Sequence, residues 1–239
     1  MFIERTDTTL KRLLLKLSGE ALSVEGKRYD DEVINGIALQ VKKLLDDGYQ
    51  IGIVIGGGNY WRGRTSENID RTKADQIGML ATVMNCIYVS ELFRSNGMKT
   101  EILTPFACST FTGMFSKDVA VKDFEEGKVV FFAGGTGHPY FSTDTGVLLR
   151  AIEVDADGIY LAKAIDGVYD SDPKKNPNAK KYDEISIDEV IEKNLQVVDM
   201  TASILARDNK MPMWVFDLTE KNSILNAVSG EFKGTKVTV

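Results

Sequence analysis

Residues 50–59 read Gln-Ile-Gly-Ile-Val-Ile-Gly-Gly-Gly-Asn, a short apolar run that ends in three consecutive glycines. This pattern predicts a buried strand over 50–55 followed by a tight loop. The same order recurs at 11–19, where an apolar run leads into Ser18-Gly19. It recurs again at 129–137, where a strand predicted over 129–133 leads into Gly-Gly-Thr-Gly. Three predicted strands therefore end in loops of small residues.

Between these strands, apolar residues recur at helical spacing over 30–47 and over 75–95, which predicts two helices. On the second of these helices we expect the buried face to carry Ile77, Leu80, Val83, Met84, Ile87 and Leu92. The remaining pattern predicts strands at 100–103, 158–162, 168–169, 214–216 and 235–239, and helices from 142–144 to 153, after 186–189, at 201–209 and at 223–228. Alternating helices and continuous apolar strands predict a single α/β domain, a three-layer αβα sandwich around a mostly parallel sheet.

Composition narrows the class of protein. The 239-residue chain is 43% hydrophobic and 27% charged, with a formal net charge of −6, as in an ordinary soluble globule. The acidic balance argues against nucleic acid or an anionic membrane as partner. Two separate cysteines, Cys86 and Cys108, and one histidine, His138, argue against a disulfide framework and a dedicated metal site. With no signal-peptide core and no run of 18 apolar residues, we expect a cytoplasmic protein.

The loops of small residues point to a phosphorylated ligand. In a parallel sheet, ligands bind at the carboxyl ends of the strands, where glycines let backbone N–H groups approach phosphate oxygens. The common nucleotide signatures fail, however. GxxxxGK[ST] is absent, Trp61 stands where the third glycine of GxGxxG belongs, and the protein-kinase HRD and DFG triplets are missing. Any phosphate chemistry must use another scaffold.

Two basic residues accompany these loops. Lys16 lies inside an apolar strand, where an unpaired ammonium group is costly. It is suited to neutralise a phosphoryl group in transfer, although an edge-strand lysine that extends into solvent would give the same pattern. Arg62 follows the glycine run and suits bidentate phosphate binding, and its alternative is a surface arginine beside Arg64.

Six motifs, in the family's order and covering essentially the whole chain, resemble the bacterial UMP kinases of the amino acid kinase superfamily. Those at 78–85 and 135–144 point to the UMP-specific branch. The motifs are Lys-Leu-Ser-Gly-Glu-Ala-Leu at 16–22, Ile-Gly-Gly-Gly-Asn-x-x-Arg-Gly at 55–63, Gly-Met-Leu-Ala-Thr-Val-Met-Asn at 78–85, Gly-Thr-Gly-x-Pro-x-Phe-x-Thr-Asp at 135–144, Asp-Gly-Val-Tyr-x-x-Asp-Pro at 166–173 and Val-Val-Asp-Met at 197–200.

The resemblance implies one amino acid kinase domain over 1–239, with a UMP-binding part at roughly 50–150 and an ATP-binding part at roughly 155–239 plus the 16–20 loop. It implies catalytic roles for Lys16, Arg62 and Asp199, with Asp199 orienting the basic groups. From the residues alone, Asp199 could equally be a helix N-cap. The implied ATP-binding residues are Lys16, Leu17, Ser18, Gly19, Gly58, Arg62, Lys163, Tyr169 and Asp172. The implied UMP-binding residues are Gly57, Asp75, Thr136, Gly137, His138, Pro139, Tyr140, Phe141, Ser142 and Thr143.

The activity implied is direct transfer of the ATP γ-phosphoryl group to UMP, giving UDP and ADP for pyrimidine nucleotide biosynthesis. Mg²⁺ carried by ATP, feedback inhibition by UTP and a homohexamer are implied with it. A superfamily kinase for a carboxylate or carbamate and a non-catalytic uridylate sensor remain open, whereas the failed glycine fingerprint disfavours a dinucleotide oxidoreductase.

Two departures from the family pattern stand out. His138 replaces the family's Asn, either as a UMP contact or as an incidental loop residue. The segment 23–28 is one residue shorter than in enterobacterial members, which leaves activation by GTP undecided.

Overall fold

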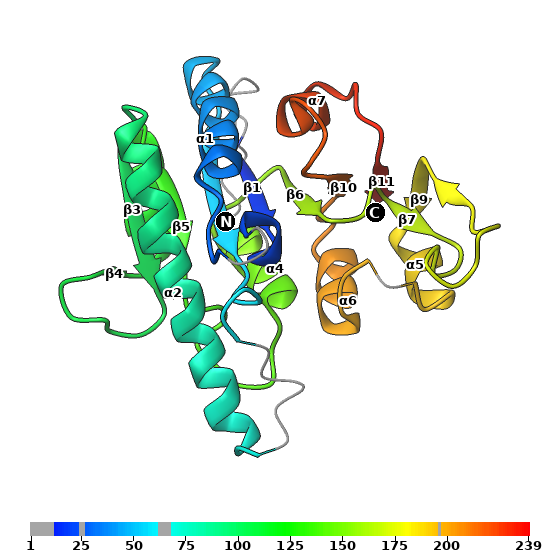
Figure 1. The fold of residues 1–239 in the computed structure, drawn as a ribbon, viewed down its shortest axis with the longest axis horizontal. Helices are drawn as coiled ribbons and strands as arrows, with labels where there is room; N and C mark the ends of the chain where they lie inside the picture. Colours follow the sequence, from blue (N-terminus) through cyan, green and yellow to red (C-terminus); the bar gives the residue numbers. More distant parts are fainter. Residues whose placement is uncertain (1–11, 24–26, 62–67, 196) are drawn as a thin grey trace, which may run out of the picture.

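The computed structural model describes residues 12–23, 27–61, 68–195 and 197–239. One large sheet runs through it in the strand order β4-β3-β5-β2-β1-β6-β10-β11-β9, and only the β10–β11 pair is antiparallel (Figure 1). A separate antiparallel pair is formed by β7 (Val168–Tyr169) and β8 (Lys181–Tyr182). The strands of the large sheet are β1 (Arg12–Leu17), β2 (Gln50–Ile55), β3 (Thr100–Thr104), β4 (Gly113–Met114), β5 (Val129–Phe132), β6 (Gly158–Lys163), β9 (Glu184–Ser186), β10 (Met213–Asp217) and β11 (Thr235–Thr238).

Helices cover both faces of this sheet, which confirms the predicted three-layer arrangement. The two hydrophobic clusters of the core lie on opposite faces, because neighbouring residues of a strand point to opposite sides. One face is covered by α1 (Asp31–Asp46), α2 (Arg71–Ser95) and α7 (Ser223–Ser229), and a 3₁₀ turn, η1 (Glu20–Leu22), packs with them. The other face is covered by α3 (Lys117–Glu125), α4 (Thr143–Glu153), α5 (Ile187–Glu192) and α6 (Met200–Asp208).

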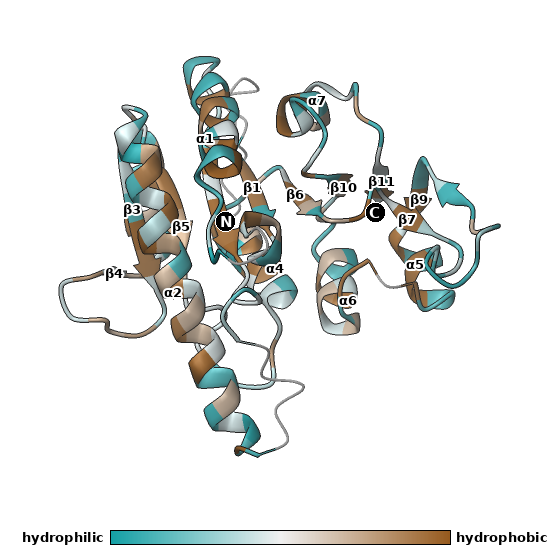
Figure 2. Cartoon of the chain, viewed as in Figure 1, coloured by the Kyte–Doolittle hydropathy of each residue, from teal (hydrophilic) through white to brown (hydrophobic). Residues whose placement is uncertain are grey.

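β1 is the strand that places Lys16. It pairs with β2 on one side and β6 on the other, so that Lys16 lies between Val54 and Leu161. The central strands are strongly hydrophobic along their length (Figure 2). Leu14, two residues before Lys16, packs on the face that carries α4, and Lys16 points to the same side. The edge-strand interpretation of Lys16 is therefore wrong.

The prediction for α2 was wrong in two respects. The helix begins at Arg71, after the N-cap Asp70, so Asp75 lies in its second turn rather than at its start. The residues expected on its buried face include Ile77, Leu80, Met84 and Ile87, which are 38%, 52%, 44% and 41% exposed. Val83 is buried as expected, and the rest of the side that faces the sheet is formed by other residues, Ala81, Cys86, Val89 and Phe93.

Length and composition alone would let α2 cross a membrane, the one such helix among the described residues. Four of its buried residues nevertheless pack in one cluster with Ile51 and Ile53 of β2 and Phe131 of β5, as in the core helix of a globular protein: Val83, Cys86, Val89 and Phe93. The sequence pattern also failed to predict α3, β4, β8 and β9, which are short or carry few apolar residues.

Two glycine-to-alanine changes should move stability in opposite directions. Gly36 lies inside α1 with no atom within 4 Å of an added Cβ, so Gly36→Ala should raise the free energy of unfolding by about 0.5–1 kcal/mol. At Gly158 the Cβ would lie 2.4 Å from Trp214, whose ring stacks on Tyr160. Gly158→Ala should therefore cost about 1–3 kcal/mol. Urea unfolding followed by circular dichroism checks both, and changes of the same sign would contradict this packing.

Candidate active site

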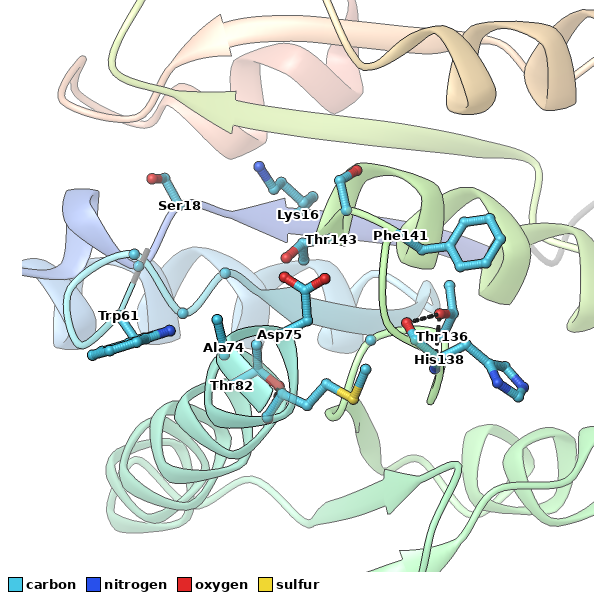
Figure 3. A pocket seen from close by; sticks show the side chains of 18 of the residues that line it. Lys16, Ser18, Trp61, Ala74, Asp75, Thr82, Thr136, His138, Phe141 and Thr143 are labelled. Atoms are coloured by element: carbon cyan, nitrogen blue, oxygen red, sulfur yellow. Dashed lines mark hydrogen bonds between the residues drawn. The ribbon is translucent and has the colours of Figure 1, made fainter. Parts of the chain in front are cut away.

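The predicted loops of small residues meet at one edge of the sheet, because β1, β2 and β5 are parallel and end there. Between them lies a cleft of about 280 Å³ (Figure 3). Most of the predicted UMP and phosphate-binding residues line it: Lys16, Ser18, Gly19, Gly57, Gly58, Asp75, Thr136, His138, Phe141, Ser142 and Thr143. The sequence therefore predicted these binding residues at positions far apart in the chain, and the fold brings them together in one cleft.

Other predicted residues lie elsewhere. Leu17 is fully buried in the core, and Gly137, Pro139 and Tyr140 belong to the loop around the cleft without lining it. Arg62 lies outside the described residues, as do residues 24–26 of the segment tied to GTP activation. The cleft also contains residues that the sequence did not single out as binding residues: Trp61, Arg71, Ala74, Gly78, Met79 and Thr82.

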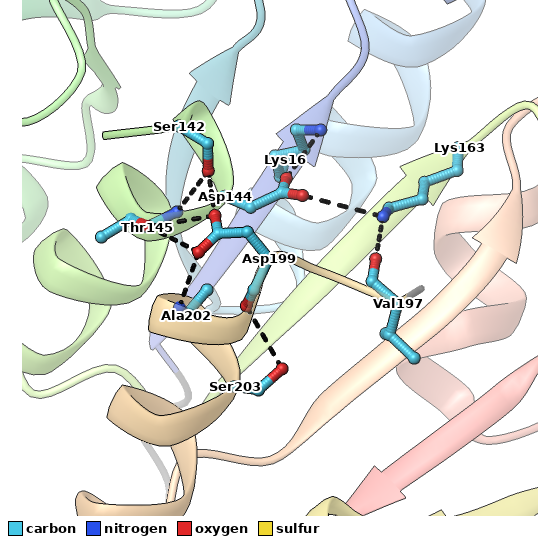
Figure 4. A network of polar contacts seen from close by, with 9 residues as sticks. All are labelled: Lys16, Ser142, Asp144, Thr145, Lys163, Val197, Asp199, Ala202 and Ser203. Carbon is cyan, nitrogen blue, oxygen red and sulfur yellow. Dashed lines mark hydrogen bonds and ion pairs between the residues drawn. The ribbon is translucent and has the colours of Figure 1, made fainter. Parts of the chain in front are cut away.

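A charged cluster joins this cleft to a second one. Lys16 Nζ lies 2.9 Å from Asp144 Oδ1, and Lys163 Nζ lies 3.9 Å from Asp144 Oδ2 (Figure 4). Lys163 also donates a hydrogen bond to the carbonyl of Val197. Asp144 and Lys163 line the adjoining cleft of about 400 Å³, and Ser142 lines both clefts. Asp144 therefore sits between two lysines at the point where the two clefts meet.

Asp144 is the residue at this site that the sequence interpretation missed. The sequence pattern places it only at the start of the helix expected from 142–144, and the N-cap of α4 is Ser142, which accepts the N–H of Thr145. The available signal was its position, one residue beyond the predicted UMP loop and on the first turn of a helix. Because that helix covers the face to which Lys16 points, a carboxylate in its first turn can reach the lysine.

Asp199 is the N-cap of α6, where it accepts the N–H of Ala202 at 3.0 Å. It also accepts hydrogen bonds from the hydroxyls of Ser142 and Thr145 (Figure 4). Within the described residues it forms no ion pair with Lys16 or Lys163. Its contacts instead hold the first turn of α4, the turn that carries Asp144.

The remaining predicted ATP-binding residues, Tyr169 and Asp172, line neither of these two clefts. Tyr169 follows β6 in the β7–β8 hairpin, and its hydroxyl donates to Asp166. Asp172 caps a turn by accepting the N–H of Lys174 at 3.0 Å.

Asp75 is tied to the loop at 136–143. Its Oδ2 accepts the backbone N–H of Tyr140 at 2.8 Å and the Nε–H of Arg71 at 2.9 Å. Tyr140 has a φ of 71°, a left-handed conformation that costs a non-glycine residue of order 1–3 kcal/mol. Thr136 Oγ1 accepts the N–H of His138 at 3.2 Å, which closes a turn inside the same loop. Asp75 thus stabilises a strained loop at the mouth of the cleft.

Within the described ranges, no group of three His, Cys, Asp or Glu side chains could hold a metal ion. Among the described residues, three carboxylates border the clefts and all are already engaged: Asp75 by Arg71 and a backbone N–H, Asp144 by lysines, and Asp199 by hydroxyls and an N–H. The donor set of this site therefore does not fit a resident divalent cation.

Burial lowers the pKa of Lys163, and the charge of Lys16 adds to this effect while that of Asp144 opposes it. A folded-state pKa below that of the unfolded chain means that the unfolded chain binds more protons between the two values, so stability rises with pH there. Methionine does not titrate. The stability of the wild type relative to Lys163→Met should therefore increase from pH about 7 to pH about 10.5, near the unfolded lysine pKa. Urea unfolding at both pH values measures this, and a constant difference would contradict it.

Known proteins share both the family sequence pattern and the fold. The model of the amino acid kinase family matches residues 11–217. The UMP kinase of Ureaplasma parvum superposes with a TM-score of 0.91 at 35% identity, covering 96% of this chain and 99% of that one. The UMP kinase of Bacillus anthracis also gives a TM-score of 0.91, at 36% identity, with coverage of 95% and 96%. The chain belongs to the amino acid kinase family.

Proposed function

We propose that this protein transfers the γ-phosphoryl group of ATP to UMP, giving UDP and ADP. The observation that carries the proposal is the Lys16–Asp144–Lys163 cluster at the junction of two clefts. A phosphoryl transfer between two nucleotides needs one site for each and positive charge where they meet. The two similar structures are named as UMP kinases, which supports UMP as the acceptor.

In this proposal, Lys16 acts on the transferred phosphoryl group. Its side chain is 12% exposed near the end of a central strand, so it is fixed in position and only partly hydrated. Charge held in advance at a partly dry site stabilises a transition state more than the same charge in water. Asp144 places a negative charge between the two lysines, which offsets their mutual repulsion.

No general base is required, because the phosphate of UMP is already ionised at neutral pH. The protein needs to align the acceptor oxygen with the γ-phosphorus and to neutralise charge, which is how enzymes catalyse most phosphoryl transfers. This agrees with a chain that has a single histidine. Since the engaged carboxylates do not fit a resident cation, we propose that Mg²⁺ enters with ATP, held by phosphates and water.

We propose that UMP occupies the first cleft, with its ribose near Asp75. The Asp75 side chain is 14% exposed and borders the cleft, and the 136–143 loop surrounds the same space (Figure 3). A screen of ADP release with UMP, CMP, dUMP, TMP and a set of carboxylate and carbamate acceptors tests the proposal. Release with UMP supports it, whereas release only with a carboxylate or carbamate, or no release at all, would contradict it.

We also propose that the protein is a homo-oligomer, with the homohexamer implied by the resemblance as the expected form. The outer face of α2 supports association, because it exposes a run of large apolar side chains at helical spacing: Ile77, Leu80, Met84, Ile87 and Tyr88. A contiguous apolar patch on a soluble chain is usually covered by a partner, and a second copy brings the same patch.

Lys16→Met should nearly abolish turnover while UMP still binds. Losing one preorganised charge at such a transition state costs about 2.7–4 kcal/mol, a factor of about 10²–10³ in kcat. Steady-state rates and calorimetry with UMP measure the two effects separately. Turnover within tenfold of the wild type would remove Lys16 from the mechanism.

Asp75→Ala should raise the KM for UMP at least tenfold and leave the KM for ATP nearly unchanged, because charge-assisted hydrogen bonds contribute about 1.5–3 kcal/mol. The preference for UMP over dUMP should also shrink, since the ribose contact is then missing for both. Measurements of kcat/KM for both nucleotides check this. If the ratio is unchanged, Asp75 acts only through its hydrogen bond to Tyr140.

A further inference from the structure

The motif at 78–85 contains a polar residue that the proposed mechanism leaves unused. Asn85 lies in the middle of α2, is 0% exposed and does not line the cleft. A buried amide must find hydrogen-bond partners, and an amide inside an otherwise apolar helix face is costly unless it does. Its partners therefore show what it holds in place.

Asn85 forms hydrogen bonds with the glycine loop, through Gly56 and Asn59, and with Tyr29. Its Nδ2 donates to the carbonyl of Gly56 at 2.7 Å and to Asn59 Oδ1 at 2.8 Å. Its Oδ1 accepts from Asn59 Nδ2 at 3.0 Å and from the hydroxyl of Tyr29 at 2.9 Å. The carbonyl of Gly56 can only accept, so this amide can be oriented in only one way.

The carbonyl of Gly56 has little room to turn elsewhere. A Cβ on Gly19 would lie 2.3 Å from it, so the two phosphate loops already touch at this point. The same peptide group contains the N–H of Gly57. Because the peptide is planar and trans, a carbonyl aimed at Asn85 sends that N–H in the opposite direction. Gly57 borders the cleft, and Asn85 lies behind it.

We propose that Asn85 is a positioning residue that aims the N–H of Gly57 at the phosphate of the acceptor nucleotide. It acts through the Gly56–Gly57 peptide and does not touch the substrate. This deepens the proposed function, on which it rests, since it assigns the α2 motif to recognition of the phosphate rather than of the nucleoside.

The discriminating measurement compares UMP with uridine, which lacks the phosphate. Asn85→Leu keeps the approximate shape of the side chain and removes the donor. It should weaken UMP binding by about 10- to 100-fold, the range of a lost hydrogen bond to a charged group, and change uridine binding by less than about threefold. Calorimetry with UMP and competition by uridine give the two affinities.

A matched control removes a different hydrogen bond of Asn85. Tyr29→Phe deletes one hydrogen bond to Asn85 Oδ1 and leaves the Nδ2 donation intact, so both affinities should stay within about threefold of the wild type. Asn85→Asp, which has the same shape but places a carboxylate beside the Gly56 carbonyl, provides a second variant if Asn85→Leu does not fold. It should show the same selective loss of UMP.

The outcomes separate the two claims. If the wild type neither binds nor phosphorylates UMP, the proposed function is wrong. If the wild type uses UMP but the Asn85 variants lose UMP and uridine equally, or lose neither, Asn85 only supports the fold and this inference is overturned.

Discussion

The structure of the site depends on one ion pair, that between Lys16 and Asp144. Lys16 is in a central strand, paired on both sides, and only 12% of its side chain is exposed, so its charge is largely removed from water. Taking such a charge out of water is costly unless a counter-charge compensates for it. The compensating carboxylate comes from the first turn of α4, a helix that begins more than a hundred residues later in the chain. The strand can therefore carry its lysine only when that helix is in place.

This pair explains how neighbouring elements are arranged. Asp199 at the start of α6 accepts hydrogen bonds from Ser142 and Thr145, which fixes the turn that carries Asp144. Thr82 of α2 accepts the N–H of Gly134 at 2.8 Å, which holds the loop at the end of β5. The loops after β2 and β5 are thus each held by a side chain of α2, Asn85 and Thr82 respectively. A site whose loops are held by rigid elements keeps its geometry without a ligand.

The sequence predicted the fold well where strands are apolar and end in glycine, as at 50–59. It predicted α2 but assigned its buried face only in part, since periodicity identifies apolar residues and does not say which of two neighbouring stripes meets the sheet. Val83 is inside as predicted, whereas Leu80 and Met84 are outside. It placed Asp75 correctly in the cleft and missed its hydrogen bond to Tyr140, a contact over 65 positions that no local pattern encodes.

The sequence by itself determined the layers, the strand-end loops and most of the residues that line the cleft. The reason is that the spacing of apolar residues and the conformational freedom of glycine are local properties of the chain. Only the tertiary structure decided that Lys16 lies in a central strand, that Asp144 rather than Asp199 pairs with it, and that Lys163 reaches the same carboxylate from β6. The physical reason is that an ion pair depends on the distance between two atoms. That distance is set by how helices pack on a sheet, which the order of residues along one strand does not contain.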